Sequence, residues 1–251
     1  MPWPLLVLAG VAAGLTGSMA GLASLFSYPA LLAAGVPPTV ANQTNTIALA
    51  TSSVGSILGS RPELRGQGAQ VRRLLPLTVL GGAVGAGLVL LTPSDTFALI
   101  VPFLVAGASL VLLRPPRRSS AAPPDGGGRL GVATTAGVVA VGVYSGYFGA
   151  AAGVVMLALL TRALAEPLIR TNAVKNVLLG ASNAVAAVAF VLLGQVAWSA
   201  AVPLTAGLLV GNYTGPALAR RLPPRVLRVG IAAAGLVLAA VLFVRAVHPV
   251  P

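Results

Sequence analysis

The chain has 251 residues, of which 57% are hydrophobic and only 8% are charged, against roughly 25% charged in an ordinary soluble domain. This composition excludes a water-soluble globule, and 30 Gly and 20 Pro residues indicate broken membrane helices. The net charge of +12 does not predict a nucleic-acid partner, because nearly all Arg residues lie in short gaps between apolar stretches. We therefore expect one all-α polytopic membrane domain over residues 1–251, with the lipid bilayer as its surroundings.

Taken in chain order, eight apolar stretches are predicted, and six of them have the length of one membrane crossing. The first and the fifth are each about 30 residues long, too long for one comfortable crossing and too short for two. The Pro-, Gly- and Arg-rich segment 114–129 is the predicted linker between two halves. The stretches cover residues 5–34, 39–58, 74–91, 97–113, 130–160, 171–193, 197–219 and 226–244.

An internal repeat relates the two halves. Four glycines with spacings of four, three and four occur twice, 132 residues apart, and the polar residues of the following stretches match at a displacement of 130. The sequence thus predicts repeat 1 at 1–113 and repeat 2 at 130–251, joined by the linker. The glycines are Gly10, Gly14, Gly17 and Gly21, then Gly142, Gly146, Gly149 and Gly153; the polar matches include Asn42 with Asn172, Asn45 with Lys175 and Thr46 with Asn176.

The positions of the Arg residues predict the topology. If the two long stretches are re-entrant hairpins broken at the glycines, 14 of the 15 Arg residues share one face, which the positive-inside rule makes cytoplasmic. Each repeat is then a re-entrant helical hairpin plus three transmembrane helices. Three is an odd number, so the repeats are inverted relative to each other. Both termini are predicted to be extracytoplasmic, in a bacterial inner membrane.

Polar side chains form a stripe on the stretch that begins near residue 39, and the matching stretch of repeat 2 repeats the stripe. Amides and hydroxyls are costly against lipid, so both stripes should face the protein interior. There they either hold helices together by hydrogen bonds or line a polar path. The recurrence in both halves favours the path.

Lys175 is the only ionisable residue well inside an apolar stretch. Such a residue marks a functional site by default, although a lysine five residues into a helix can also extend its ammonium to the membrane surface. Asn45 holds the equivalent place in repeat 1. A cation and neutral amide donors converging from the two halves would suit a small anion.

The glycine quartets also allow two interpretations. Small residues every four positions let helices pack closely, and broken helices expose backbone N–H groups and helix N-termini that attract anions. The two interpretations of the glycines are compatible with each other. Ser18 beside Gly17, and the alanines beside Gly149, leave room for a ligand to approach the backbone.

Enzyme chemistry is not expected. The chain has no Cys, its one His lies in the last four residues, and its four acidic residues fall in or beside loops. We therefore predict no catalytic residues, no metal, no cofactor and no buried acid for a proton relay. The acidic residues are Glu63, Asp95, Asp125 and Glu166.

Five segments together resemble the sulfite exporter TauE/SafE family of bacterial membrane transporters, and the resemblance covers nearly the whole chain. The segments are GLTGSMAG from Gly14, YPALLAAGVPPTVANQTN from Tyr28, GYFGAAAG from Gly146, TNAVKNVLLGASN from Thr171 and PLTAGLLVGNYTGPALARRL from Pro203.

The resemblance implies export of sulfite, organosulfonate or a related sulfur-containing anion. The implied substrate region comprises Asn42, Thr44, Asn45, Thr171, Asn172, Lys175 and Asn176, together with Gly17, Ser18, Gly21, Gly149 and Gly153. The alternative is a membrane anchor or assembly subunit that transports nothing, and the sequence leaves the oligomeric state open.

Overall fold

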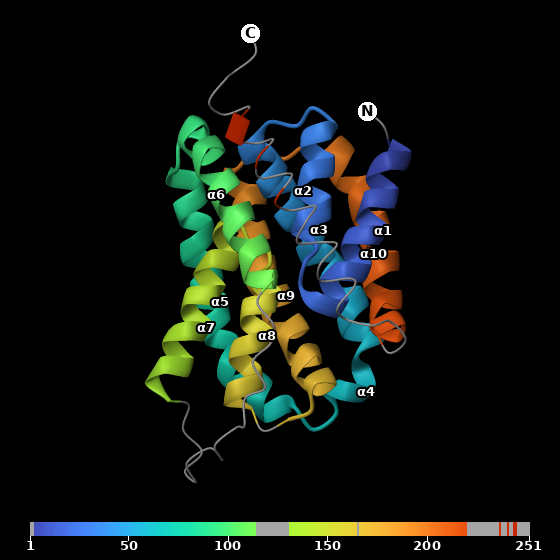
Figure 1. Ribbon diagram of the computed structural model, residues 1–251, viewed down its shortest axis with the longest axis vertical. Helices are drawn as coiled ribbons and strands as arrows, with labels where there is room; N and C mark the ends of the chain where they lie inside the picture. The colour runs from blue at the N-terminus through green and yellow to red at the C-terminus, as the bar shows by residue number, and fades with distance from the viewer. Residues whose placement is uncertain are drawn as a thin grey trace.

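The computed structural model describes residues 3–113, 131–164 and 166–219, with residues 236, 240, 243 and 244. Over these residues the protein consists of ten helices and no strands, which confirms the all-helical fold (Figure 1). The helices are α1 (Trp3–Ala20), α2 (Ser24–Ala33), α3 (Pro38–Gly59), α4 (Arg61–Leu64), α5 (Gly68–Leu91), α6 (Ser94–Leu113), α7 (Val132–Tyr147), α8 (Ala152–Ala163), α9 (Leu168–Leu193) and α10 (Trp198–Ala219).

Each of the two long apolar stretches contains two helices separated by a short break. The chain turns between α1 and α2 at Gly21, where φ is +75°, and between α7 and α8 at Gly149 and Ala151, where φ is +71° and +56°. Both reversals lie midway along the long axis in Figure 1, and α2 and α8 run from there toward opposite ends. The left-handed backbone at Gly21 and Gly149 explains why glycine is used there, since a Cβ is disfavoured in this conformation, whereas Ala151 adopts it with its Cβ.

The remaining helices follow the predicted stretches with two differences. The helix α5 begins at Gly68, six residues before the apolar stretch, because the polar segment that carries Arg72 and Arg73 is helical as well. The short helix α4 was not predicted, since hydropathy carries no signal for one helical turn in a loop. The linker 114–129 and the last apolar stretch, 226–244, lie outside the described residues apart from isolated positions in the latter.

The two halves exchange their hairpins. The most extensive helix contacts join α1 of the first half to α10 of the second, and α7 of the second half to α5 of the first. A Cβ added at Gly14 would meet the backbone of Gly211 and Asn212, so these helices touch backbone to backbone. The long helices α3 and α9 also pack against each other. Neither half could therefore be removed without exposing the hairpin of the other.

The surface of the bundle is apolar along its sides. Large hydrophobic side chains in the middle of helices, such as Leu80, Phe103 and Val188, are between 58% and 64% exposed, an arrangement typical of a lipid-facing surface. Two of the described helices, α5 and α9, are long and apolar enough to cross a bilayer by length and composition alone. The 22-residue α3 reaches about 33 Å, but its polar stripe lowers its mean hydropathy.

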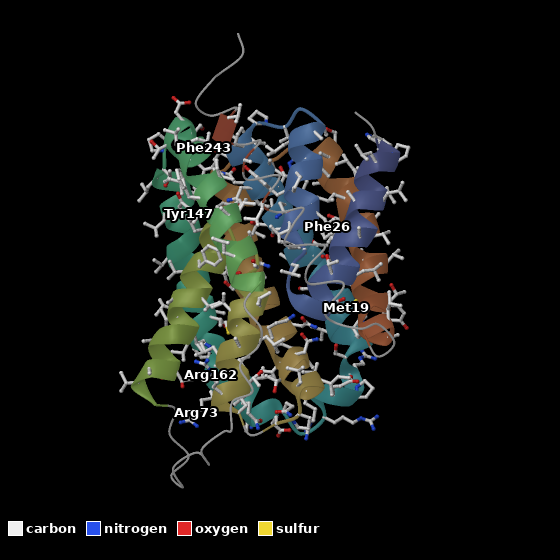
Figure 2. The ribbon with its side chains drawn as sticks, in the orientation of Figure 1. Met19, Phe26, Arg73, Tyr147, Arg162 and Phe243 are labelled. Carbon is white, nitrogen blue, oxygen red and sulfur yellow. The ribbon has the colours of Figure 1, made fainter. Side chains whose placement is uncertain are left out.

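The arginine side chains of the described residues gather at one end of the bundle. Figure 2 shows Arg73 and Arg162 at the end where α4 lies. The others come from α4, the residue after it, α5 and the beginning of α9, and the described arginines are Arg61, Arg65, Arg72, Arg73, Arg162 and Arg170. The two ends of the molecule therefore differ in charge.

The contact between α5 and α7 can be tested with two glycines on one helix. A Cβ at Gly85 would collide with the Val143 carbonyl oxygen, whereas a Cβ at Gly87 has open space around it. We expect Gly85→Ala to destabilise the protein by about 1–3 kcal/mol through overpacking. Gly87→Ala should be neutral or stabilising, because alanine favours a helix over glycine. Thermal unfolding of the purified protein in detergent would show this difference, and equal melting temperatures would contradict it.

Candidate functional site

A polar cavity of about 80 Å³ lies where the breaks of the two hairpins meet. Its walls come from α1, α2, α3, α7, α8, α9 and α10, so both halves contribute to it. Hydroxyl, amide and ammonium groups make up much of the lining. The polar residues are Ser18, Ser24, Thr46, Ser53, Ser56, Ser145, Lys175, Asn176, Asn183 and Asn212.

The two glycine breaks touch each other at this cavity. A Cβ at Gly21 would collide with the backbone of Gly153, and a Cβ at Gly153 with that of Gly21. These residues are 132 positions apart, so they are equivalent members of the two glycine quartets. Equivalent residues meet in this way when they lie near an axis that relates two halves. The contact leaves no room for a side chain at either position.

Two helices begin at the cavity. Ser24 is the first residue of α2, Ala152 and Gly153 open α8, and all three line the cavity. The N-terminus of a helix carries a partial positive charge and unpaired N–H groups. Because α2 and α8 leave the cavity in opposite directions (Figure 1), their positive ends face it from two sides. This arrangement favours a negatively charged ligand.

Lys175 supplies the cavity's only charged side chain among the described residues that line it. It is 1% exposed, and its ammonium lies 3.4 Å from the Gly17 carbonyl oxygen, at the end of α1. Its ammonium therefore points into the protein rather than toward the end of the bundle. No carboxylate of the described residues lies within ion-pair distance, and the acid on the loop before α9, Glu166, pairs with Arg170 instead.

Asparagines from one half bind the broken helix of the other. Asn172 and Asn176 on α9 donate to the Ser18 carbonyl oxygen at 3.0 and 3.5 Å, and Asn42 on α3 donates to the Tyr147 carbonyl oxygen at 2.8 Å. These carbonyls belong to the C-terminal ends of α1 and α7, where the last carbonyls of a helix have no N–H partner within it. The asparagines thus satisfy backbone groups that the breaks would leave unpaired.

The predicted site residues fall into three groups. Seven line the cavity: Gly17, Ser18, Gly21, Gly149, Gly153, Lys175 and Asn176. Asn42, Asn45 and Asn172 lie beside it and contact the hairpins, Asn45 through a 3.2 Å hydrogen bond to Ser24. Thr44 and Thr171 lie away from it. Thr44 accepts a hydrogen bond from the Ala197 N–H at 3.0 Å, and Thr171 donates to the Pro167 carbonyl oxygen at 3.2 Å. Both threonines therefore stabilise the ends of loops and helices.

Several cavity residues were not among the predicted site residues. Asn212 on α10 donates to the hydroxyl and carbonyl oxygens of Ser52, at 2.9 and 3.1 Å, and Ser145 donates to Asn183 at 3.2 Å. A signal existed for Asn183, which belongs to the repeated polar stripe. Asn212 lies in PLTAGLLVGNYTGPALARRL, one of the five segments that carry the family resemblance, but it has no partner in the repeated polar stripe.

The helical bundle has an apolar surface, a central polar cavity and broken helices at mid-depth. This is the architecture of a membrane transporter. The chain belongs to the sulfite exporter TauE/SafE family, whose model matches residues 6–242. No solved structure matches the chain.

Relatives in three bacteria carry transporter names. The chain is 29% identical to the probable membrane transporter protein YfcA of Escherichia coli over 84% of this chain and 76% of that protein. It is 26% identical to a probable membrane transporter protein of Haemophilus influenzae, over 82% and 80% of the two chains. It is 27% identical to the probable membrane transporter protein ORF9 of a Sinorhizobium species, over 97% and 93%. The protein is therefore a membrane transporter.

The contact between the two breaks and the left-handed backbone both make a side chain at Gly21 costly. Their effects on stability can be separated by comparing two glycines with similar φ. Gly21 and Gly35 have φ of +75° and +83°, but only Gly21 has a neighbour that a Cβ would strike. Gly35→Ala should cost about 1–2 kcal/mol for the left-handed backbone, and Gly21→Ala should cost about 1–3 kcal/mol more for the collision. Melting temperatures of the two variants measure this, and equal losses would contradict the close contact.

Proposed function

We propose that the protein exports small sulfur-containing anions, of the sulfite or organosulfonate class, across the bacterial inner membrane. The observation that carries the proposal is the buried ammonium of Lys175, which has no carboxylate partner among the described residues and lines a cavity at which two helices begin. A desolvated cation in this position is stabilised by a bound anion. The family description, sulfite exporter, supplies the substrate class.

The size and chemistry of the cavity support a small oxyanion. About 80 Å³ is room for a small anion with the volume of about five to eight water molecules, judged against the roughly 10–15 Å³ that one water needs by the same measure. Sulfite fits within this limit, and so does a sulfonate with a short substituent. Hydroxyl and amide groups around Lys175 would donate hydrogen bonds to the oxygens.

Export is the direction that needs no coupling ion. An inside-negative membrane potential drives an anion outward by about 2.3 kcal/mol per charge per 100 mV. The same potential opposes accumulation of an anion inside the cell. A protein that provides a path with an anion site therefore favours export.

The topology we propose is two inverted repeats, 1–113 and 130–251, each with a re-entrant hairpin. The reciprocal packing of α1 on α10 and of α7 on α5 supports it, because one inverted relationship would generate both contacts. The contact of equivalent glycines, Gly21 and Gly153, supports it as well. The end that carries Arg73 and Arg162 is then cytoplasmic (Figure 2), and both termini lie on the extracytoplasmic side.

A rocking motion between two helix groups would open the cavity alternately to each side. One group is α1, α3 and α10, the other is α5, α7 and α9, and each group is packed within itself. The groups meet through α3 and α9, and the two hairpin breaks touch nearby, so the hinge we propose lies beside the cavity. Rigid groups that rock about a fixed central site are a common plan among secondary transporters.

The role of Lys175 can be tested by a change that removes its charge and keeps much of its bulk. We expect Lys175→Met to lower sulfite efflux from proteoliposomes by about tenfold to a hundredfold, the value of one charge-assisted hydrogen bond. Arg162→Met, which removes an exposed charge at the end of α8, serves as the control and should retain efflux. Normal efflux by folded Lys175→Met would refute this site.

The topology can be tested with single cysteines, since the chain has none of its own. We expect cysteines at Gly68 and Leu168 to react with a membrane-impermeant maleimide only after the cells are permeabilised. Cysteines at Gly35 and Gln195 should react in intact cells. Labelling of positions 68 and 168 from opposite sides of the membrane would contradict the inverted arrangement.

A further inference from the structure

The cavity does not lie midway between the two ends of the bundle. On α3 its lining residues run from Thr46 to Ser56, and on α9 they run from Lys175 to Asn183. The arginine end of the bundle is where α3 ends and α9 begins, so both stretches lie nearer to the arginine end of their helix. The way from the cavity to the opposite end of the bundle is therefore the longer one.

Three aromatic rings close this longer way. Phe148 lines the cavity, and its ring lies edge-on to Tyr28 and to Phe97, with centroids 5.2 and 6.2 Å away. All three rings are at most 2% exposed and belong to the larger of the two buried hydrophobic clusters. Tyr28 lies on α2, which leaves the cavity toward the end opposite the arginines, and Figure 2 shows Tyr147, the neighbour of Phe148, on that side.

The contact between Tyr28 and Phe148 joins the two helix groups that would rock against each other. The helix α2, which carries Tyr28, packs on α1 and α3, whereas the break that holds Phe148 connects α7 and α8, which pack on α9. Phe148 follows the last residue of α7 and precedes the left-handed Gly149, so it lies outside both helices. Its ring can therefore move without unwinding a helix.

A loop at the same end is bound across the same division. The side-chain oxygen of Gln43 on α3 accepts a hydrogen bond from the Gln195 N–H at 2.7 Å, and the Thr44 hydroxyl accepts one from the Ala197 N–H at 3.0 Å. Both side chains are buried. These bonds fix the end of α9, which belongs to one group, to α3, which belongs to the other.

The arginine end has neither feature. At the displacement of 132, Thr16 corresponds to Phe148 and Leu160 to Tyr28, so no aromatic ring stands at the equivalent positions. The loop before α5 is bonded by Arg170, a 35% exposed side chain that donates to the Arg65 carbonyl oxygen at 2.8 Å. Water competes for such an exposed bond, so it adds little to closure. The equivalents of Gln43 and Thr44 are Ala173 and Val174.

We propose that Phe148, packed against Tyr28 and Phe97, is the gate that closes the anion path on the side opposite the arginines, and that the structure shows this gate closed. Buried apolar rings exclude a hydrated anion, as hydrophobic constrictions do in channels. Rocking of the two helix groups separates Tyr28 from Phe148 and breaks the bonds of Gln43 and Thr44. The inference rests on the proposed function for the direction of transport and for the side that is extracytoplasmic.

The test uses a single cysteine, since the chain has none. Ser53→Cys lines the cavity, and its reaction with a membrane-impermeant anionic methanethiosulfonate is followed in intact cells. Adding Phe148→Ala should raise the labelling rate about tenfold, because two ring contacts that favour the closed gate are lost. Phe148→Leu, which keeps an apolar side chain, should raise it less. Equal rates in Ser53→Cys with and without Phe148→Ala would overturn the proposal.

Phe26→Ala is the matched control. This ring also lies on α2 (Figure 2), but it does not line the cavity and makes no ring contact among the described residues. The labelling rate of Ser53→Cys should be unchanged by Phe26→Ala. A rise equal to that of Phe148→Ala would mean that loosening this end in general admits the reagent, and it would overturn the gate.

A second variant keeps the test decisive if Phe148→Ala does not fold. Tyr28→Leu removes the other ring of the contact and keeps an apolar side chain, so it should also speed labelling of Ser53→Cys. Unchanged labelling in folded Tyr28→Leu would overturn the proposal. Labelling needs no transported anion, so failure of the anion-export proposal would show in the liposome assay and leave the labelling result in place.

Discussion

The need to satisfy the backbone at the breaks of α1 and α7 organises this protein. An interrupted helix within an apolar bundle leaves carbonyls and N–H groups that neither lipid nor its own helix can pair. Here the carbonyls are paired by asparagines of the opposite half, Asn42 for α7 and Asn172 and Asn176 for α1. Each hairpin is therefore completed by the other half of the chain. The freed N-termini of α2 and α8 are left facing a shared cavity.

Close packing follows from the same constraint. The exchanged hairpins reach their partners only if helices approach backbone to backbone, which requires glycines on both sides of the contact, as in Gly14 against Gly211 and Gly85 against Gly146. These glycines serve stability, whereas Gly21 and Gly153 serve the geometry of the cavity. A single spacing pattern in the sequence thus has two physical roles along one helix, close packing near its outer end and a break near its inner end.

Much of the fold could be predicted from the sequence because its signals are local. Apolar length gave the helices, Pro37 and Pro38 marked the start of α3, and the glycine spacing gave the positions of both breaks. The cavity was harder to predict because it depends on contacts between distant segments. Thr44 carries the same polar signal as Thr46, yet one bonds to the α9–α10 loop and the other lines the cavity. Asn212 has no polar counterpart in the other repeat, so the internal repeat could not predict its place at the cavity.

The most informative departure from the repeat is the exchange of Lys175 for Asn45. Two halves of equal charge would give the central cavity a symmetric potential, and an anion would have no preferred side. With one ammonium near the end of α1 and the neutral amide of Asn45 beside Ser24 at the start of α2, the potential is more positive toward α9. An anion should therefore lie closer to Lys175 than to Asn45. The departure from the repeat at this one position therefore gives a bound anion one preferred side of a cavity that both halves line.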